Sequence, residues 1–187
     1  ATFFKDGFVL KKALFSSDEV EALNLVVNND PIIQKAIYGR SDASGASTEL
    51  ALWTDLGNDM FSAVARSARI VNSLESVLGG KIAFFHSKLT LKRPKIGGAW
   101  DWHQDYGYWY RNGYFFPHMA SVFLALDPSK KINGCLQVLK GSHHLGRIEH
   151  GINKDQVGAD MVRVDHAKKC FDLVEVEMDP GDALFFH

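Results

Sequence analysis

His103 and Asp105 are the two residues of this sequence whose types and spacing best suit a metal site. In an extended backbone, residues i and i+2 point to the same side, so the imidazole and the carboxylate would face one point. The aromatic residues that follow, from Tyr106 to Tyr110, favour a strand. Such a pair suits a divalent metal such as Fe(II), which in a two-His-one-carboxylate site takes a second His from a distant strand and keeps positions open for a bidentate cosubstrate and dioxygen. A His-x-Asp triplet alone is a weak indication.

The size and composition of the chain predict one globular domain. Its 187 residues are enough to bury about 70% of the surface that the unfolded chain would expose. The formal net charge of -1 provides no basic field for nucleic acid, and no apolar run approaches the roughly 20 residues that a membrane span needs. The two cysteines, Cys135 and Cys170, form no close-spaced pair, and the first ten residues are too polar for a signal peptide. We therefore expect a cytoplasmic protein with reduced thiols.

Helix signals dominate the first eighty residues. Ser16 is placed as an N-cap, and Glu19, three residues later, completes a capping box. This helix should end before Pro31, which can begin a second, shorter one. A further helical pattern runs over residues 60–78 and stops at Gly79. We expect three or four helices in this part of the chain.

Residues 39–48 are small and polar and have almost nothing to bury. They predict a mobile surface loop. A lid over a site would have the same composition, and a loop without function is the simpler interpretation. Two other loops, residues 111–117 and 146–169, would share with it the task of setting substrate specificity.

After residue 80 the pattern changes to short segments rich in aromatic and β-branched residues. The predicted strands are residues 81–92, 100–110, 118–127, 135–139, 171–178 and 183–187. Because helical patterns do not alternate with these strands, they indicate an antiparallel sandwich or barrel rather than a parallel sheet. The helices would cover one sheet of this β portion.

Several motifs stand in a distinctive order along the chain. They are Phe4-Lys5-Asp6-Gly7-Phe8-Val9, His86-Ser87-Lys88, Lys92-Arg93-Pro94, Trp102-His103-Gln104-Asp105, Ser121-Val122-Phe123-Leu124-Ala125-Leu126-Asp127, Asn133-Gly134-Cys135-Leu136 through Gly141-Ser142-His143, and Pro180-Gly181-Asp182-Ala183-Leu184-Phe185-Phe186-His187. Their order and spacing resemble the phytanoyl-CoA dioxygenase family of Fe(II)- and 2-oxoglutarate-dependent oxygenases. The resemblance implies an α+β, mainly β fold: a double-stranded β-helix (jelly roll, cupin-like) core with N-terminal helices packed on one sheet. It implies a single domain over residues 1–187, helical over 1–80 and jelly-roll over 81–187.

The resemblance also implies roles for individual residues. His103 and Asp105 match the first two iron ligands. Lys88 and Phe123 match positions that line the 2-oxoglutarate pocket, although relatives commonly carry Met and Trp there. Gln104 belongs to the same cofactor site, where its side chain would orient the loop or the neighbouring strand rather than bind metal.

Other aromatic residues and histidines are less specific. Trp100 and Trp109 would supply walls of a substrate pocket, although core or surface packing explains such aromatic residues equally well. The remaining internal histidines are interpreted as packing or surface residues; they are His86, His118, His143, His144, His150 and His166.

The sequence departs from the family pattern at its end. In the family, the third iron ligand and an Arg that pairs with the distal carboxylate of 2-oxoglutarate follow the Gly-Asp-x-x-x-Phe-His block. His187 matches the first His of that block. We therefore expect the third ligand, the Arg and the last strands to lie outside this sequence. His187 could replace the missing ligand, but its position in the block favours a different role.

The implied reaction hydroxylates an unactivated C–H bond of a small organic substrate, using Fe(II), 2-oxoglutarate and dioxygen, with decarboxylation of 2-oxoglutarate to succinate. Asp105 favours hydroxylation, since related halogenases replace this carboxylate with a small residue to admit halide. One alternative is a non-catalytic jelly-roll binding module or an inactive fragment, which the early end fits and the intact His103–Asp105 pair opposes. A zinc hydrolase that uses the same pair is a second alternative, but no motif indicates an Asp or Glu that could act as its general base. The substrate and the oligomeric state stay open.

Overall fold

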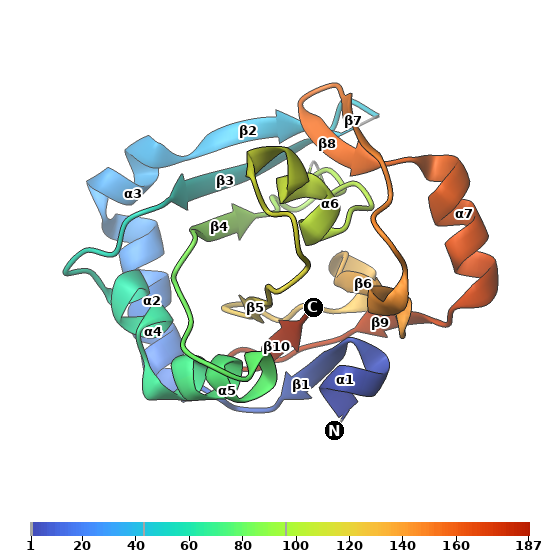
Figure 1. The fold of residues 1–187 in the computed structure, drawn as a ribbon. Helices are drawn as coiled ribbons and strands as arrows, with labels where there is room; N and C mark the ends of the chain where they lie inside the picture. Colours follow the sequence, from blue (N-terminus) through green and yellow to red (C-terminus); the bar gives the residue numbers. More distant parts are fainter. Residues whose placement is uncertain (1, 43, 96) are drawn as a thin grey trace.

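The computed structural model of the protein describes residues 2–42, 44–95 and 97–187, and Figure 1 shows the arrangement of its elements. The helices are α1 (Thr2–Asp6), α2 (Ser17–Asn29), α3 (Pro31–Ala36), α4 (Met60–Ala65), α5 (Ala68–Leu78), α6 (Asp105–Trp109) and α7 (Met161–Cys170). The strands are β1 (Phe8–Lys11), β2 (Tyr38–Ser41), β3 (Ser47–Trp53), β4 (Ser87–Leu91), β5 (Ser121–Leu124), β6 (Leu136–Leu139), β7 (His150–Asn153), β8 (Gln156–Ala159), β9 (Leu173–Val176) and β10 (Ala183–Phe186). Within the described ranges, no helix is both long and apolar enough to cross a membrane.

Two three-stranded sheets lie on opposite sides of the molecule, with α6 between them (Figure 1). One has the strand order β2-β3-β4 and the other β1-β10-β5, and a two-stranded sheet of β6 and β9 lies beside the second. The strand pairs in these sheets are antiparallel, as the sequence predicts. Ser121 of β5 donates a hydrogen bond to Asp105, so the second sheet contacts the start of α6.

The β1-β10-β5 sheet has apolar contacts on both faces, because successive side chains of a strand point to opposite sides. Ala183 and Phe185 of β10 pack in a cluster with residues of the N-terminal elements, which are Phe3, Phe15, Val20 and Ile70. Leu184, on the opposite face, packs with Val176 and Met178. Helices therefore cover one face of this sheet, while the other face contacts the β6-β9 sheet.

The beginning of α2 confirms the predicted capping box. The Ser16 hydroxyl accepts a hydrogen bond from the Glu19 N–H, and the Glu19 carboxylate accepts one from the Ser16 N–H at 2.8 Å. Asp30 then caps α3, whose first residue is Pro31, as predicted. These signals act within a few residues of one another, so the sequence is sufficient to locate them.

The prediction that residues 39–48 form a surface loop with nothing to bury is wrong. Gly39 pairs with Glu49 and Ser41 with Ser47 in the β2-β3 ladder, and Asp42 and Thr48 are buried. The Asp42 carboxylate accepts hydrogen bonds from Ser44 and Ala46 in the turn and from the Ala99 N–H at 2.8 Å. Hydrogen bonds thus hold this polar turn in place, and the hydrophobic periodicity of the sequence does not indicate them. Residue 43 lies outside the described part of the chain.

Three other assignments are corrected. In the predicted strand over residues 100–110, residues 100–104 belong to no helix or strand, and the rest form the helix α6 and the start of a 3₁₀ turn (Tyr110–Asn112). Contacts from distant segments override the β propensity of the aromatic residues. The predicted loop 146–169 contains β7, β8 and most of α7. Within residues 2–42 and 44–80, the structure has five helices and also β1, β2 and β3. The other five predicted strand segments each contain a strand, shorter than expected: β4, β5, β6, β9 and β10.

Asp42 should make the stability of this fold depend on acidity. The Ser44 hydroxyl and then the Ala99 N–H stabilise its ionised form and lower its pKa from 3.8 to about 2. A lowered pKa in the folded state contributes stability that is present above the ordinary pKa and is lost as the pH falls toward 2. We expect Asp42→Asn to lower Tm at pH 7 by several degrees, with a difference from wild type that shrinks between pH 4 and pH 2.

Thermal unfolding at several pH values checks this expectation, with Asp55→Asn on the exposed surface as the matched control. An equal Tm difference at pH 7 and pH 2 would show that the loss comes from packing alone.

Candidate metal centre

His103 and Asp105 lie together although they are not in a strand. His103 belongs to the segment that connects β4 to α6, and Asp105 is the first residue of α6. Gln104, between them, has an extended backbone with φ −103° and ψ 132°. One extended residue is enough to turn its two neighbours to the same side, and His103 Nε2 lies 3.4 Å from Asp105 Oδ1.

The hydrogen bonds of His103 leave Nε2 available as a ligand atom. His103 Nδ1 lies 2.7 Å from the Asp101 carbonyl oxygen. A carbonyl can only accept, so Nδ1 carries the proton and Nε2 presents a lone pair when the ring is neutral. Two ligand atoms that bind one metal at right angles, each at about 2.1 Å, lie about 3 Å apart. The 3.4 Å separation therefore fits a shared metal ion after a small adjustment.

The other oxygen of Asp105 is held by Ser121 of β5, whose hydroxyl donates to Oδ2 at 2.5 Å. In the metal-free protein, burial favours the neutral acid, but the hydrogen bond and charge of a doubly protonated His103, the Ser121 hydroxyl and the charge of Lys88 outweigh it and lower the pKa of Asp105 to about 2. The carboxylate is thus ionised at neutral pH. A metal ion would take the place of the proton on Nε2 of His103. Oδ1 is the oxygen that faces the imidazole, and the donor set fits a divalent metal that takes nitrogen and oxygen ligands.

The residues predicted for the cosubstrate pocket lie on the strands that flank the pair. Lys88 is on β4, and its Nζ lies 4.3 Å from the ring centre of Trp100. Phe123 is two residues beyond Ser121 on β5, so it shares the sheet face that contacts Asp105, and it packs with Leu184 across the strand pair. The structure thus brings Lys88, Trp100 and Phe123 around the pair, while their roles in binding stay predictions.

The Gln104 side chain joins the metal-ligand segment to the chain that leads into β7. Its Oε1 accepts from the Ile148 N–H at 2.7 Å, and its Nε2 donates to the Gly146 carbonyl at 3.1 Å. These bonds orient the neighbouring loop. A role of Gln104 in the cofactor site stays a prediction.

An aromatic cluster extends from α6 on the side of β4. Trp109 packs edge to face against Phe85, and its ring centre lies 5.1 Å from that of His86. His86 has a buried Nδ1 for which the described residues provide no hydrogen-bond partner. Burial lowers the pKa of His86, Lys88 lowers it further and Asp105 opposes the change. His86 therefore lies close to the candidate centre.

Two side chains that no sequence pattern connects with the candidate site contact its backbone: His150, interpreted above as a packing or surface residue, and Gln156. Both side chains are buried, and both hydrogen bond to the segment that carries His103. Their partners lie 46 and 55 residues away, so no local pattern could have indicated them.

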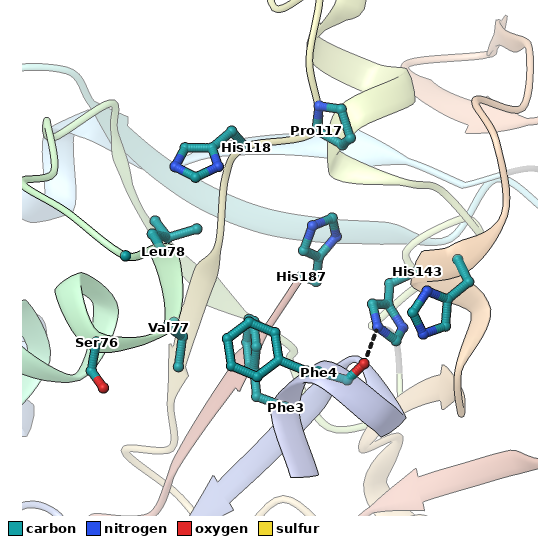
Figure 2. A pocket seen from close by; sticks show the side chains of 11 residues that line it. Phe3, Phe4, Ser76, Val77, Leu78, Pro117, His118, His143 and His187 are labelled. Carbon is teal, nitrogen blue, oxygen red and sulfur yellow. Dashed lines mark hydrogen bonds between the residues drawn. The ribbon is translucent and has the colours of Figure 1, made fainter. Parts of the chain in front are cut away.

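His187 does not join the pair. It lies in a hollow of about 420 Å³ at the end of β10 that Phe3, Phe4, His118 and His143 also line (Figure 2). The ring centre of His187 is 5.6 Å from that of His143, whose Nε2 donates to the Phe4 carbonyl. Across residues 2–42, 44–95 and 97–187, no group of three or more His, Cys, Asp or Glu side chains is arranged to hold a metal ion. The described chain therefore brings together two candidate ligand residues, His103 and Asp105.

Comparisons with known proteins point to one family. The family model for phytanoyl-CoA dioxygenase (PhyH) matches residues 3–187. L-proline trans-4-hydroxylase of Streptomyces griseoviridis is 31% identical over 93 residues, which cover 49% of this chain and 35% of that protein. Ectoine dioxygenase of Halomonas elongata is 26% identical over 157 residues, which cover 77% of this chain and 45% of that protein. The chain thus spans less than half the length of these two relatives.

Solved structures share the fold. EctD from S. alaskensis with bound Fe has a TM-score of 0.79 at 20% identity, covering 99% of this chain and 65% of that chain. SnoK, a non-heme alpha-ketoglutarate-dependent carbocyclase from nogalamycin biosynthesis, has a TM-score of 0.76 at 17% identity, covering 100% of this chain and 72% of that chain. At such identities the likeness concerns the arrangement of helices and strands.

Proposed function

The chain belongs to the phytanoyl-CoA dioxygenase family, and on this basis we propose that it acts as an Fe(II)- and 2-oxoglutarate-dependent dioxygenase that hydroxylates a small organic molecule. One observation carries the proposal. His103 Nε2 and Asp105 Oδ1, a neutral nitrogen donor and a carboxylate oxygen, face each other at 3.4 Å. These two residues would supply one nitrogen and the carboxylate oxygen of the two-His-one-carboxylate set of a non-heme Fe(II) site.

In the proposed site, His103 and Asp105 hold iron, and the residues behind them fix their orientation. The Asp101 carbonyl keeps the His103 proton on Nδ1, and the Ser121 hydroxyl occupies Oδ2 of Asp105 so that Oδ1 stays directed at the site. When bound, iron, 2-oxoglutarate and dioxygen supply the oxidant for C–H hydroxylation, while 2-oxoglutarate is converted to succinate and carbon dioxide.

The other residues of the proposed pocket would bind 2-oxoglutarate and the substrate, and would exclude water. We infer that Lys88 places a positive charge beside a carboxylate of 2-oxoglutarate, since its charge already acts on Asp105. Phe123 would pack against the carbon chain of this cosubstrate from the β5 side, and Gln104 would keep the adjoining loop in place. Trp100 and Trp109 would form apolar walls that hold the substrate and keep water out.

We infer that the two facing sheets form a double-stranded β-helix in a single domain over residues 1–187. The antiparallel pairing and the similarity to EctD and SnoK support this assignment. For the substrate we propose a small molecule with an unactivated C–H bond, in line with the proline and ectoine named for two of the relatives.

Anaerobic titration of the purified protein with Fe(II) and then 2-oxoglutarate tests the proposal. We expect a weak visible charge-transfer band that appears only when both are present, because 2-oxoglutarate must bind the metal through two atoms. The 187-residue chain and the full product of its gene are titrated side by side. If neither gives the band, the alternative of a non-catalytic binding module replaces the enzyme.

A further inference from the structure

The hairpin of β7 and β8 holds the backbone that carries His103 and Asp105. The buried Gln156 side chain accepts from the Asp101 N–H at 2.9 Å and donates to the Ala99 carbonyl at 3.0 Å. The Ala159 N–H donates to the Trp102 carbonyl at 2.7 Å. The hairpin thus hydrogen bonds to three of the four residues that precede His103, and its first residue, His150, contacts the residue that follows.

His150 accepts the backbone N–H that lies between the two ligands. Its Nε2 is 2.9 Å from the Gln104 nitrogen, and its Nδ1 is 2.7 Å from the Ile148 carbonyl oxygen. The carbonyl requires a proton on Nδ1, and the Gln104 N–H requires a lone pair on Nε2, so both contacts are satisfied only by one neutral tautomer. The side chain is 5% exposed, which leaves little room for water to replace it.

Gly107 allows His150 to approach α6 this closely. A Cβ at position 107 would lie 2.2 Å from Cε1 of His150, a distance that non-bonded atoms do not adopt. Glycine in a helix is less stable than alanine. Any larger residue at position 107 would overlap the His150 ring, so the close packing of α6 against His150 requires glycine.

We propose that His150 is a positioning residue for the metal centre: through its neutral Nε2 it fixes the extended backbone of Gln104 and thereby the directions of the His103 and Asp105 side chains. The description of these two residues as metal ligands rests on the proposed function. The backbone arrangement itself does not, so the two can be tested separately.

The test uses His150→Leu, which keeps an apolar side chain of useful size but removes the acceptor. Amide hydrogen exchange of the metal-free protein reports on the backbone, and we expect the Gln104 N–H to exchange about tenfold faster. Titration with Co(II), a spectroscopic substitute for Fe(II), reports on the ligands, and we expect binding to weaken about 10–100-fold, as is typical when a supporting residue is lost.

Two further variants separate positioning from general destabilisation. In His150→Gln the side-chain amide oxygen can accept near the position of Nε2, so protection of Gln104 and Co(II) binding should largely return. Gly107→Ala should reproduce the His150→Leu result by displacing the imidazole, although alanine favours the helix. His166→Leu on the exposed surface of α7 is the control, with no expected change.

Unchanged Gln104 exchange and Co(II) binding in His150→Leu would overturn the proposal, as would a His150→Gln protein that behaves like His150→Leu. If wild type does not bind Co(II), the proposed function fails, and exchange at Gln104 alone then decides whether His150 holds this backbone.

Discussion

Asp105→Ala is expected to weaken Fe(II) binding by more than about 100-fold and to abolish the 2-oxoglutarate charge-transfer band. Loss of a residue that only supports a ligand typically costs about 10–100-fold in metal affinity, and Asp105 is itself one of the two proposed ligands, which lie close together in the structure. The ionised carboxylate also supplies the negative charge of the pair, since its pKa is about 2. Substrate turnover should fall below detection.

Two controls make this result specific. Ser121→Ala removes the hydrogen bond to Oδ2 but leaves Oδ1 in place, so Fe(II) binding should weaken by about tenfold. The titration is done without chloride, because a small residue at position 105 could leave space for a halide. If Asp105→Ala binds Fe(II) and 2-oxoglutarate as wild type does, Asp105 is not a ligand and the proposed function loses its main support.

Gly181→Ala is expected to reduce the free energy of unfolding by about 3–5 kcal/mol, because it combines two costs. Gly181 has a φ of 90°, a region that alanine rarely adopts. A Cβ there would also lie 2.2 Å from the Phe15 carbonyl oxygen. The surrounding backbone cannot easily move, since the Phe15 N–H donates to the Gly181 carbonyl and the Gly181 N–H donates to Ala125.

Two other glycines separate these costs in urea-unfolding measurements. Gly79 has a φ of 75° with no atom within 4 Å of the added Cβ, so Gly79→Ala should cost only the conformational penalty of about 1–2 kcal/mol. Gly80 has neither feature, and Gly80→Ala should change the free energy of unfolding by less than about 0.5 kcal/mol. A cost for Gly181→Ala no larger than that for Gly79→Ala would show that the backbone near Phe15 yields to the methyl group.

Local signals in the sequence predicted local structure well. The capping box of Ser16 and Glu19 and the proline at position 31 fix the boundaries of α2 and α3 because each signal and its effect lie within four residues. The antiparallel pairing of the strands also followed from the pattern alone. The identity of the pair His103 and Asp105 came from motif order, and their convergence needs only one extended residue, Gln104.

Features that depend on distant contacts were not predictable. The aromatic run after Asp105 has strand propensity, yet it forms α6, whose Gly107 admits the ring of His150 from a hairpin some forty residues later. Asp42 lies in a segment that was predicted to be a surface loop without function. Its contribution to the fold comes from hydrogen bonds, one of them from the distant Ala99 N–H. The helix α7 was overlooked although Asp160 caps its first turn. The first two features depend on residues far away in the sequence, whereas the cap of α7 is a local signal.

The pairing of β1 with β10 has a consequence for how the chain folds as it is made. Phe8–Lys11 leaves the ribosome before the strand that it pairs with, Ala183–Phe186, which follows about 170 residues later. At the usual synthesis rate of about 5–20 residues per second, β1 waits roughly 9–35 s with an open edge, a condition that favours aggregation. Lys11 and Lys12, at the end of β1, place charge where another chain would otherwise dock.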